Sequence, residues 1–175
     1  MEATGFYACA VTALCNIAKW SGDFLIYNSI SSSFTRLWYY TNTTYYDTTS
    51  HNEVAITLGQ TPNSGIASGF ISYLNDFSCT CLCSTDYYPI YQDFKDAVIA
   101  GKYATFSYGI SINGNGGSPV RSGHTVAVIG YYKGANSNGN TCQFLKVANG
   151  WDTSPDYLNY EQTVFLDKYA CFFTI

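Results

Sequence analysis

The sequence predicts a single α+β domain in which helices come first and an antiparallel sheet follows. Two observations carry this prediction: helix-forming runs, one of them with apolar residues at helical spacing between Ile66 and Leu74, lie before residue 101, and short apolar or alternating runs separated by turn residues follow from residue 103. The 175 residues suffice for one compact core, and no internal repeat or low-complexity linker divides them. A cleft between the helical half and the sheet half is then a natural place for a functional site.

Three helices are expected in the first hundred residues. They cover residues 9–20, a stretch from about 62–64 to Asn75, and residues 91–100. Gly22 and Gly101 close the first and third of these, as glycine commonly does after a last helical turn. The intervening residues 24–60 are rich in Thr, Tyr and Ser and predict no particular element.

The second half of the sequence predicts strands. Short runs rich in Tyr, Val, Ile and Phe cover residues 103–112, 124–132, 142–148, 162–167 and 169–175. Turn-forming stretches at residues 113–117 and 136–140 separate the first three runs. We interpret the Gly-rich stretch 113–117 as a flexible hairpin or the rim of a cleft, since it lacks the Gly-Lys-Ser/Thr ending of a phosphate-binding loop.

The composition excludes some classes of function. Charged residues make up 11% of the chain, against about 25% in an average protein, and no cluster of Lys and Arg exists to neutralise nucleic-acid phosphates. No apolar run reaches the eighteen or so residues that a membrane span needs. A neutral surface with many tyrosines is common among exported proteins, so we expect a secreted or cell-surface protein. We also expect it to be a monomer. Residues 1–7 do not resemble a signal peptide, so we expect any export signal to lie outside this chain.

Cys9 is the candidate nucleophile. It stands at the predicted start of the first helix, where free N–H groups and the partial positive charge of the helix favour the thiolate. The backbone amide of Cys9 could stabilise an oxyanion at an attacked carbonyl. Seven cysteines leave one without a partner even if the others pair. A lone cysteine at such a position is more often plain core, so Cys9 alone decides nothing.

His124 is the candidate base. It follows Gly123 and heads a strongly apolar run, which places it at the mouth of a strand with the imidazole free to face a cleft. Taken singly, it could equally be a structural histidine at a strand edge. The other histidine, His51, lies in a polar stretch and is expected to be solvated.

Asn149 is the candidate orienting residue. It follows the predicted strand that ends at Ala148 and precedes Gly150 and Trp151. Its amide oxygen could accept from one ring nitrogen of the histidine and leave the other nitrogen facing the sulfur. Trp151 could cover that hydrogen bond and exclude water. The ordinary alternative is an Asn-Gly turn that ends a strand.

Together these three residues resemble the nucleophile, base and orienting residue of papain-like cysteine peptidases. The similarity is closest to bacterial streptopain-like and C39-like domains, and it is carried by residues 9–13, 123–131 and 144–151, with further likeness at 66–75 and 97–102. It covers most of the chain except residues 24–60. The resemblance implies a papain-like fold, a peptide or protein substrate, and neither cofactor nor metal.

Three departures from the family accompany this resemblance. The Cys-Gly-Ser/Ala-Cys-aromatic signature of the papain subfamily is absent. The family usually carries a Gln shortly upstream of the cysteine, but residues 2–8 contain none, and an ionised Glu2 cannot donate. Transporter-linked C39 domains usually carry an Asp in the third role, which Asn149 does not match. Because this Gln is missing, the alternative that the domain is inactive stays open.

Two further motifs have ordinary explanations. Cys79, Cys81 and Cys83 are separated by single residues, whereas zinc sites normally have longer spacers, so we interpret them as a small apolar strip on a strand. Asn42 with the two threonines that follow it matches a glycosylation acceptor, a pattern that often occurs by coincidence.

The sequence as a whole predicts a cysteine endopeptidase that works through a thioacyl intermediate. Trp151 and Tyr131 could favour an apolar side chain on the substrate. Two alternatives stay open. The same triad could transfer the acyl group to an amine. The low charge, the many Tyr and Thr residues and the missing Gln also fit a non-catalytic adhesion or binding module.

Overall fold

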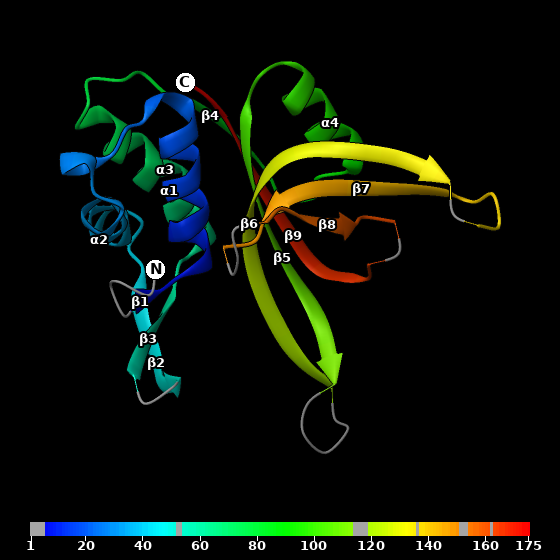
Figure 1. Ribbon diagram of the computed structural model, residues 1–175, viewed down its shortest axis with the longest axis horizontal. Helices are drawn as coiled ribbons and strands as arrows, with labels where there is room; N and C mark the ends of the chain where they lie inside the picture. The colour runs from blue at the N-terminus through cyan, green and yellow to red at the C-terminus, as the bar shows by residue number, and fades with distance from the viewer. Residues whose placement is uncertain (1–5, 52–53, 114–118, 136, 151–153, 162) are drawn as a thin grey trace. The chain divides into compact units, whose positions relative to one another are not determined.

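The computed structural model describes residues 6–51, 54–113, 119–135, 137–150, 154–161 and 163–175. These residues form an α+β structure with an antiparallel sheet, as the sequence predicts. They divide into two compact units, one of residues 1–83 with Ile175 and one of residues 84–174 (Figure 1). That residues 1–175 act together as one peptidase domain stays a prediction.

The first unit consists of helices and a small sheet. Its elements are β1 (Phe6–Tyr7), α1 (Cys9–Gly22), the 3₁₀ helix η1 (Ile26–Asn28), α2 (Ile30–Tyr40), β2 (Thr44–His51), β3 (Val54–Gln60) and α3 (Asn63–Asn75). Strand β3 lies in the middle of this sheet, parallel to β1 and antiparallel to β2. The two helices predicted here are confirmed as α1 and α3. The stretch 24–60, for which the sequence predicts no element, contains α2 and the β2–β3 hairpin.

Helix α1 is the most buried helix of the first unit. Its apolar side chains are buried on nearly all sides, and both α2 and α3 contact it. The helix ends at Gly22, two residues after the predicted last residue, where Asp23 adopts the left-handed conformation (φ 56°, ψ 38°). The N–H of Asp23 donates to the carbonyl of Lys19, and that of Phe24 donates to the carbonyl of Ala18. This termination satisfies carbonyls that the last turn would otherwise leave open.

Two glycines of α3 let that helix approach the end of α2. A Cβ on Gly65 would lie 2.1 Å from the carbonyl oxygen of Thr41, and one on Gly69 would lie 2.7 Å from the Thr41 Cα. Side chains at either position would therefore force the helices apart. The close approach accompanies a contact of Asp76, directly after α3, with Arg36 and Tyr40 of α2.

The second unit is built on a six-stranded sheet. The strands are β4 (Leu82–Asp86), β5 (Tyr103–Asn113), β6 (Pro119–Ala135), β7 (Thr141–Ala148), β8 (Asp156–Asn159) and β9 (Phe165–Thr174), in the order β4-β9-β5-β6-β7-β8. Strand β9, the last in the chain, thus lies between β4 and β5 (Figure 1). Helix α4 (Tyr91–Ile99), the third predicted helix, packs on β5, β6 and β7.

Several strand predictions need correction. The runs 162–167 and 169–175 form one strand, β9, because polar Asp167 and Lys168 stay in the ladder opposite Gly109 and Tyr108 of β5. Strand β6 begins at Pro119 rather than at residue 124, since the residues before His124 pair with the end of β5.

Two short segments were also misjudged from the sequence. Strand β8 was not predicted at all, and it pairs with β7 through contacts such as Leu158 opposite Leu145. The predicted cysteine-bearing strand is wrong for most of its length: β4 starts at Leu82, so Cys79 and Cys81 precede it. Of these cysteines, Cys81 is buried and Cys79 is half-buried.

The core of the second unit lies between α4 and one face of the sheet. Phe94 of α4 meets Phe106 of β5 edge to face at 4.9 Å, and both rings are fully buried. The remaining buried members are Tyr91, Ala104, Val126, Val128, Leu145, Val147 and Ala170. Tyr108 and Phe165 pack against this cluster and extend it along β5 toward the row that contains His124.

Candidate active site

Cys9 is the first residue of α1, in the first unit. Ala8 before it is extended (φ −142°, ψ 112°) and gives the helix no side-chain cap, and the first turn holds no acidic residue. No carboxylate in the first turn therefore neutralises the partial positive charge of the helix start or occupies its free amides. The thiol is half-buried and in no disulfide bond. The predicted helix start at Cys9 is confirmed, and the nucleophilic role of Cys9 stays a prediction.

Cys15 shows what a structural thiol looks like in the same helix. It lies six residues after Cys9, is 5% exposed and faces the interior of the first unit. Burial raises its pKa to about 12, so at neutral pH it stays a protonated thiol. Cys81 is similar, because burial raises its pKa to about 11. Neither group is available as a thiolate nucleophile near neutral pH.

His124 lies inside strand β6, in the second unit. It pairs with Tyr108 of β5, and the two rings meet edge to face with centroids 6.1 Å apart. Since side chains alternate along a strand, His124 shares its face with Val126 and Val128, on the side where α4 packs. The sequence placed His124 at the mouth of a strand; the structure places it within the strand and beside the aromatic core.

The electrostatics of His124 suit a base. Burial lowers the pKa of the imidazole below its ordinary value of 6.5, and a hydrogen bond with the main chain of Asn149 opposes this shift only in part. A bond that raises the pKa of an imidazole is one that the ring donates, so the Asn149 main chain is the acceptor. At neutral pH the ring is therefore uncharged and able to take a proton.

The β6–β7 ladder brings Asn149 to His124. Ala127 pairs with Ala148, the last residue of β7, so Asn149 follows directly after the ladder ends. Gly150 then takes a positive φ of 81°, as expected for an Asn-Gly turn. The structure thus joins His124 and Asn149 through the Asn149 main chain. The orienting role predicted for the Asn149 side chain stays a prediction.

Asp156 holds the side chain of Asn149. The amide nitrogen Nδ2 of Asn149 donates to the carboxylate of Asp156, at the start of β8. A carboxylate only accepts hydrogen bonds, so the amide nitrogen must face Asp156 and the amide oxygen stays an acceptor for other groups. The side-chain oxygen of Asn149 would need this orientation of the amide group to accept a hydrogen bond from an imidazole.

Tyr108 and Asp156 were not identified from the sequence. Tyr108 could have been found from the β5–β6 hairpin, because the turn stretch 113–117 sets which residue lies opposite His124. Asp156 could not, since its position depends on the short strand β8 and on its register with β7.

Other predicted residues have mixed outcomes. Trp151 and residues 114–117 lie outside the described residues, and so does the side chain of His51. Tyr131 is 38% exposed on β6, with the Lys95 ammonium 5.8 Å from its ring centre. Asn42 is exposed just before β2, and its modification stays a prediction.

The described part of the chain contains no group of three or more His, Cys, Asp or Glu side chains placed to hold a metal ion. Within that same part, no helix combines the length and the apolar character needed to cross a membrane. Neither observation bears on the triad itself.

Comparison with models of known protein families finds no match for this chain, and comparison with curated proteins finds none either. The functional argument therefore rests on the residues themselves: a thiol at a helix start, and a neutral imidazole held by the main chain of Asn149.

Proposed function

We propose that this chain is a papain-like cysteine peptidase with Cys9 as nucleophile, His124 as base and Asn149 as orienting residue. One observation supports the proposal above the others: the imidazole of His124 is kept neutral by burial, and its ring donates to the main chain of Asn149, the residue whose side chain we expect to orient it.

The proposed reaction follows from these roles. The Cys9 thiolate attacks a peptide carbonyl, and the Cys9 backbone amide donates to the oxyanion that forms. His124, protonated by the thiol, gives that proton to the leaving amine, which leaves a thioacyl group on Cys9. His124 then removes a proton from water, which attacks the thioacyl carbonyl and releases the acid. The mechanism requires the Cys9 sulfur and the His124 ring to come within hydrogen-bonding reach.

The first test labels the thiol. An epoxide thiol trap should modify Cys9 at neutral pH, and mass spectrometry of the digested protein should locate the label. Cys9→Ala should remove this label, and His124→Ala should slow labelling of Cys9 by at least about tenfold, because the base that generates the thiolate is gone. Cys79→Ala, which removes another half-buried thiol of the first unit, is the matched control, and Cys9 in this variant should be labelled at the rate of the parent protein. Equal labelling rates in the parent and His124→Ala proteins would count against the triad.

A second test asks whether the two groups meet. In a His124→Cys variant, mild oxidation should join residues 9 and 124 in a disulfide, which requires their Cα atoms to come within about 7 Å. A variant with cysteine at Thr125, whose side chain lies on the opposite face of β6, is the control and should not form this bond. Failure of the first variant to crosslink would remove the basis for catalysis by these residues.

Product analysis separates peptide hydrolysis from acyl transfer. With a fluorogenic peptide library, the proposed activity releases free acids, and the Cys9→Ala variant releases none. If an added amine captures most of the acyl group, the chain is a transferase that uses the same triad. If no peptide turns over while Cys9 still labels at the rate of an ordinary thiol, the chain is a non-catalytic binding module.

A further inference from the structure

The first unit carries an open groove beside η1, α2 and the end of α3 that the proposed peptidase function does not use. The groove has a volume of about 800 Å³ and is lined by two tyrosines, two hydroxyl-bearing residues, one ion pair and the apolar residues Ile26 and Phe77. The lining residues that matter here are Tyr27, Ser32, Thr35, Arg36, Tyr39 and Asp76. Since the two charges in this lining pair with each other, the groove favours a ligand without net charge.

Two tyrosine rings of the groove are presented to solvent. Tyr27 is 92% exposed and Tyr39 is 74% exposed. Tyr27 also has a left-handed backbone (φ 52°, ψ 30°), which an aromatic residue adopts only when its surroundings impose it.

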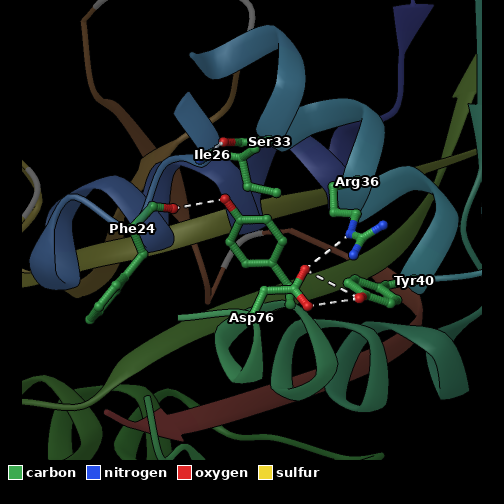
Figure 2. Close-up of polar contacts among 7 residues, drawn as sticks. Phe24, Ile26, Ser33, Arg36, Tyr40 and Asp76 are labelled. Carbon is green, nitrogen blue, oxygen red and sulfur yellow. Dashed lines mark hydrogen bonds and ion pairs between the residues drawn. The ribbon is translucent and has the colours of Figure 1, made fainter. Parts of the chain in front are cut away.

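Two hydrogen bonds at residues just before Tyr27 anchor the chain there. The amide of Ile26 donates to Ser33 Oγ at 2.8 Å, and the hydroxyl of Tyr73 donates to the carbonyl of Phe24 at 2.7 Å (Figure 2). These bonds anchor the main chain before Tyr27, and the Tyr27 ring projects into solvent. A solvated aromatic ring offers an apolar face to a ligand.

The polar part of the groove is also fixed in place. Asp76 accepts from Arg36 Nε at 3.0 Å and from the Tyr40 hydroxyl at 2.9 Å, and the guanidinium lies 4.8 Å from the Tyr40 ring centre (Figure 2). These contacts orient the guanidinium plane through Nε and leave its two terminal nitrogens for a ligand. Thr35 donates its hydroxyl hydrogen to the Ser31 carbonyl, so its oxygen can still accept.

We infer that this groove binds a neutral saccharide, with sugar rings stacked on Tyr27 and Tyr39 and their hydroxyls bonded to Arg36, Asp76 and Thr35. A sugar hydroxyl both donates and accepts, which matches the mixture of donor and acceptor groups on this surface. An anionic ligand would meet the Asp76 carboxylate. An apolar peptide segment would offer no acceptor to the two terminal guanidinium nitrogens, since Asp76 accepts only from Nε. The inference is independent of the proposed peptidase function.

The test uses the full chain in native gels cast with dextran, mannan, xylan or a soluble β-glucan, and with hyaluronate as an anionic polymer. At least one neutral polymer should retard the protein, and the matching free oligosaccharide should compete. The variants Tyr27→Ala, Tyr39→Ala and Arg36→Lys should each weaken the apparent affinity by at least about threefold, and the two tyrosine changes together by about tenfold or more. Tyr88→Ala, which removes a ring that is 83% exposed in the second unit, is the matched control and should bind normally.

Further outcomes separate this inference from the peptidase proposal. The Cys9→Ala variant should be retarded like the parent protein, because the groove does not include the thiol. Circular dichroism should show each groove variant folded, since Tyr27, Tyr39 and Arg36 are exposed. The inference is overturned if no neutral polymer retards the protein, if hyaluronate alone does so, or if Tyr27→Ala and Tyr88→Ala weaken binding equally.

Discussion

His124 in the second unit and Arg36 in the first are both nitrogen bases, but their surroundings shift their pKa values in opposite directions. The imidazole lies beside an aromatic core, and burial lowers its pKa. The guanidinium is 47% exposed, and its hydrogen bond with Asp76 raises its pKa further. The comparison shows that a chain with few charged residues can still hold one neutral base in its interior and one oriented cation at its surface.

The largest effect should come from breaking the aromatic core beside His124. Phe106→Ala removes a fully buried ring that contacts Phe94 and Tyr108, and we expect a loss of about 3–5 kcal/mol in the free energy of unfolding. Urea denaturation measures it. Leu166→Ala on the exposed side of β9 is the control and should change stability by less than about 0.5 kcal/mol. A similar loss in both variants would mean that this core does not support the second unit.

The next effect is a dependence of stability on pH. Because the folded pKa of His124 lies below its unfolded value, the unfolded chain binds the proton more readily. Stability is then fully present above about pH 6.5 and falls as the pH drops below that value. Thermal unfolding from pH 8 to pH 5 should show a smaller fall in His124→Gln than in the parent. His51→Gln is the control, and an equal fall in parent and His124→Gln would contradict the assignment.

A smaller effect should follow from reversing the Asn149–Asp156 contact. Asn149→Asp sets two carboxylates against each other where an amide now donates, and we expect a loss of about 1 kcal/mol in the free energy of unfolding at pH 7. Adding Asp156→Asn restores an amide–carboxylate pair with its polarity reversed. The double variant should recover most of the loss in a double-mutant cycle. Purely additive losses would show that the two side chains do not interact.

The smallest effect on stability is expected at the exposed ion pair of Arg36 and Asp76. Asp76→Asn removes the ion pair with Arg36, but solvent screens a pair at this position. The melting temperature should stay within about a degree of the parent value, since surface pairs contribute little. A large drop would show that the contact between Asp76 and α2 holds the first unit together.

Elements with an apolar pattern or a closing glycine could be predicted from the sequence, while those in residues 24–60 and the short strand β8 could not. Helix α3 was predicted from apolar residues at helical spacing, while α1 and α4 were predicted from helix-forming runs that a glycine closes. Helix α2 was missed because serines fill its first turn and only Ser33, Phe34 and Leu37 are buried. Its one local signal was Ser29, whose side chain accepts from the Ser32 amide at the helix start.

The candidate site divides along the same line. Cys9 and His124 could be assigned from the helix start and the apolar strand, which are local signals. The contact between His124 and Asn149 could be proposed because their two strands pair as a hairpin. Tyr108 was within reach of the same hairpin reasoning, but the position of Asp156 depends on the register of the short strand β8 with β7, which no local pattern encodes.

The position of β9 has a consequence for synthesis of the protein. Strands β4 and β5 are joined by α4 in the chain, yet β9 separates them in the sheet. While the ribosome is still making the segments before residue 165, β4 has no strand beside it and β5 has one edge open. The nascent chain should therefore expose strand edges with unpaired backbone N–H and C=O groups, which can pair with other chains. Chaperone binding at this stage would protect it from aggregation.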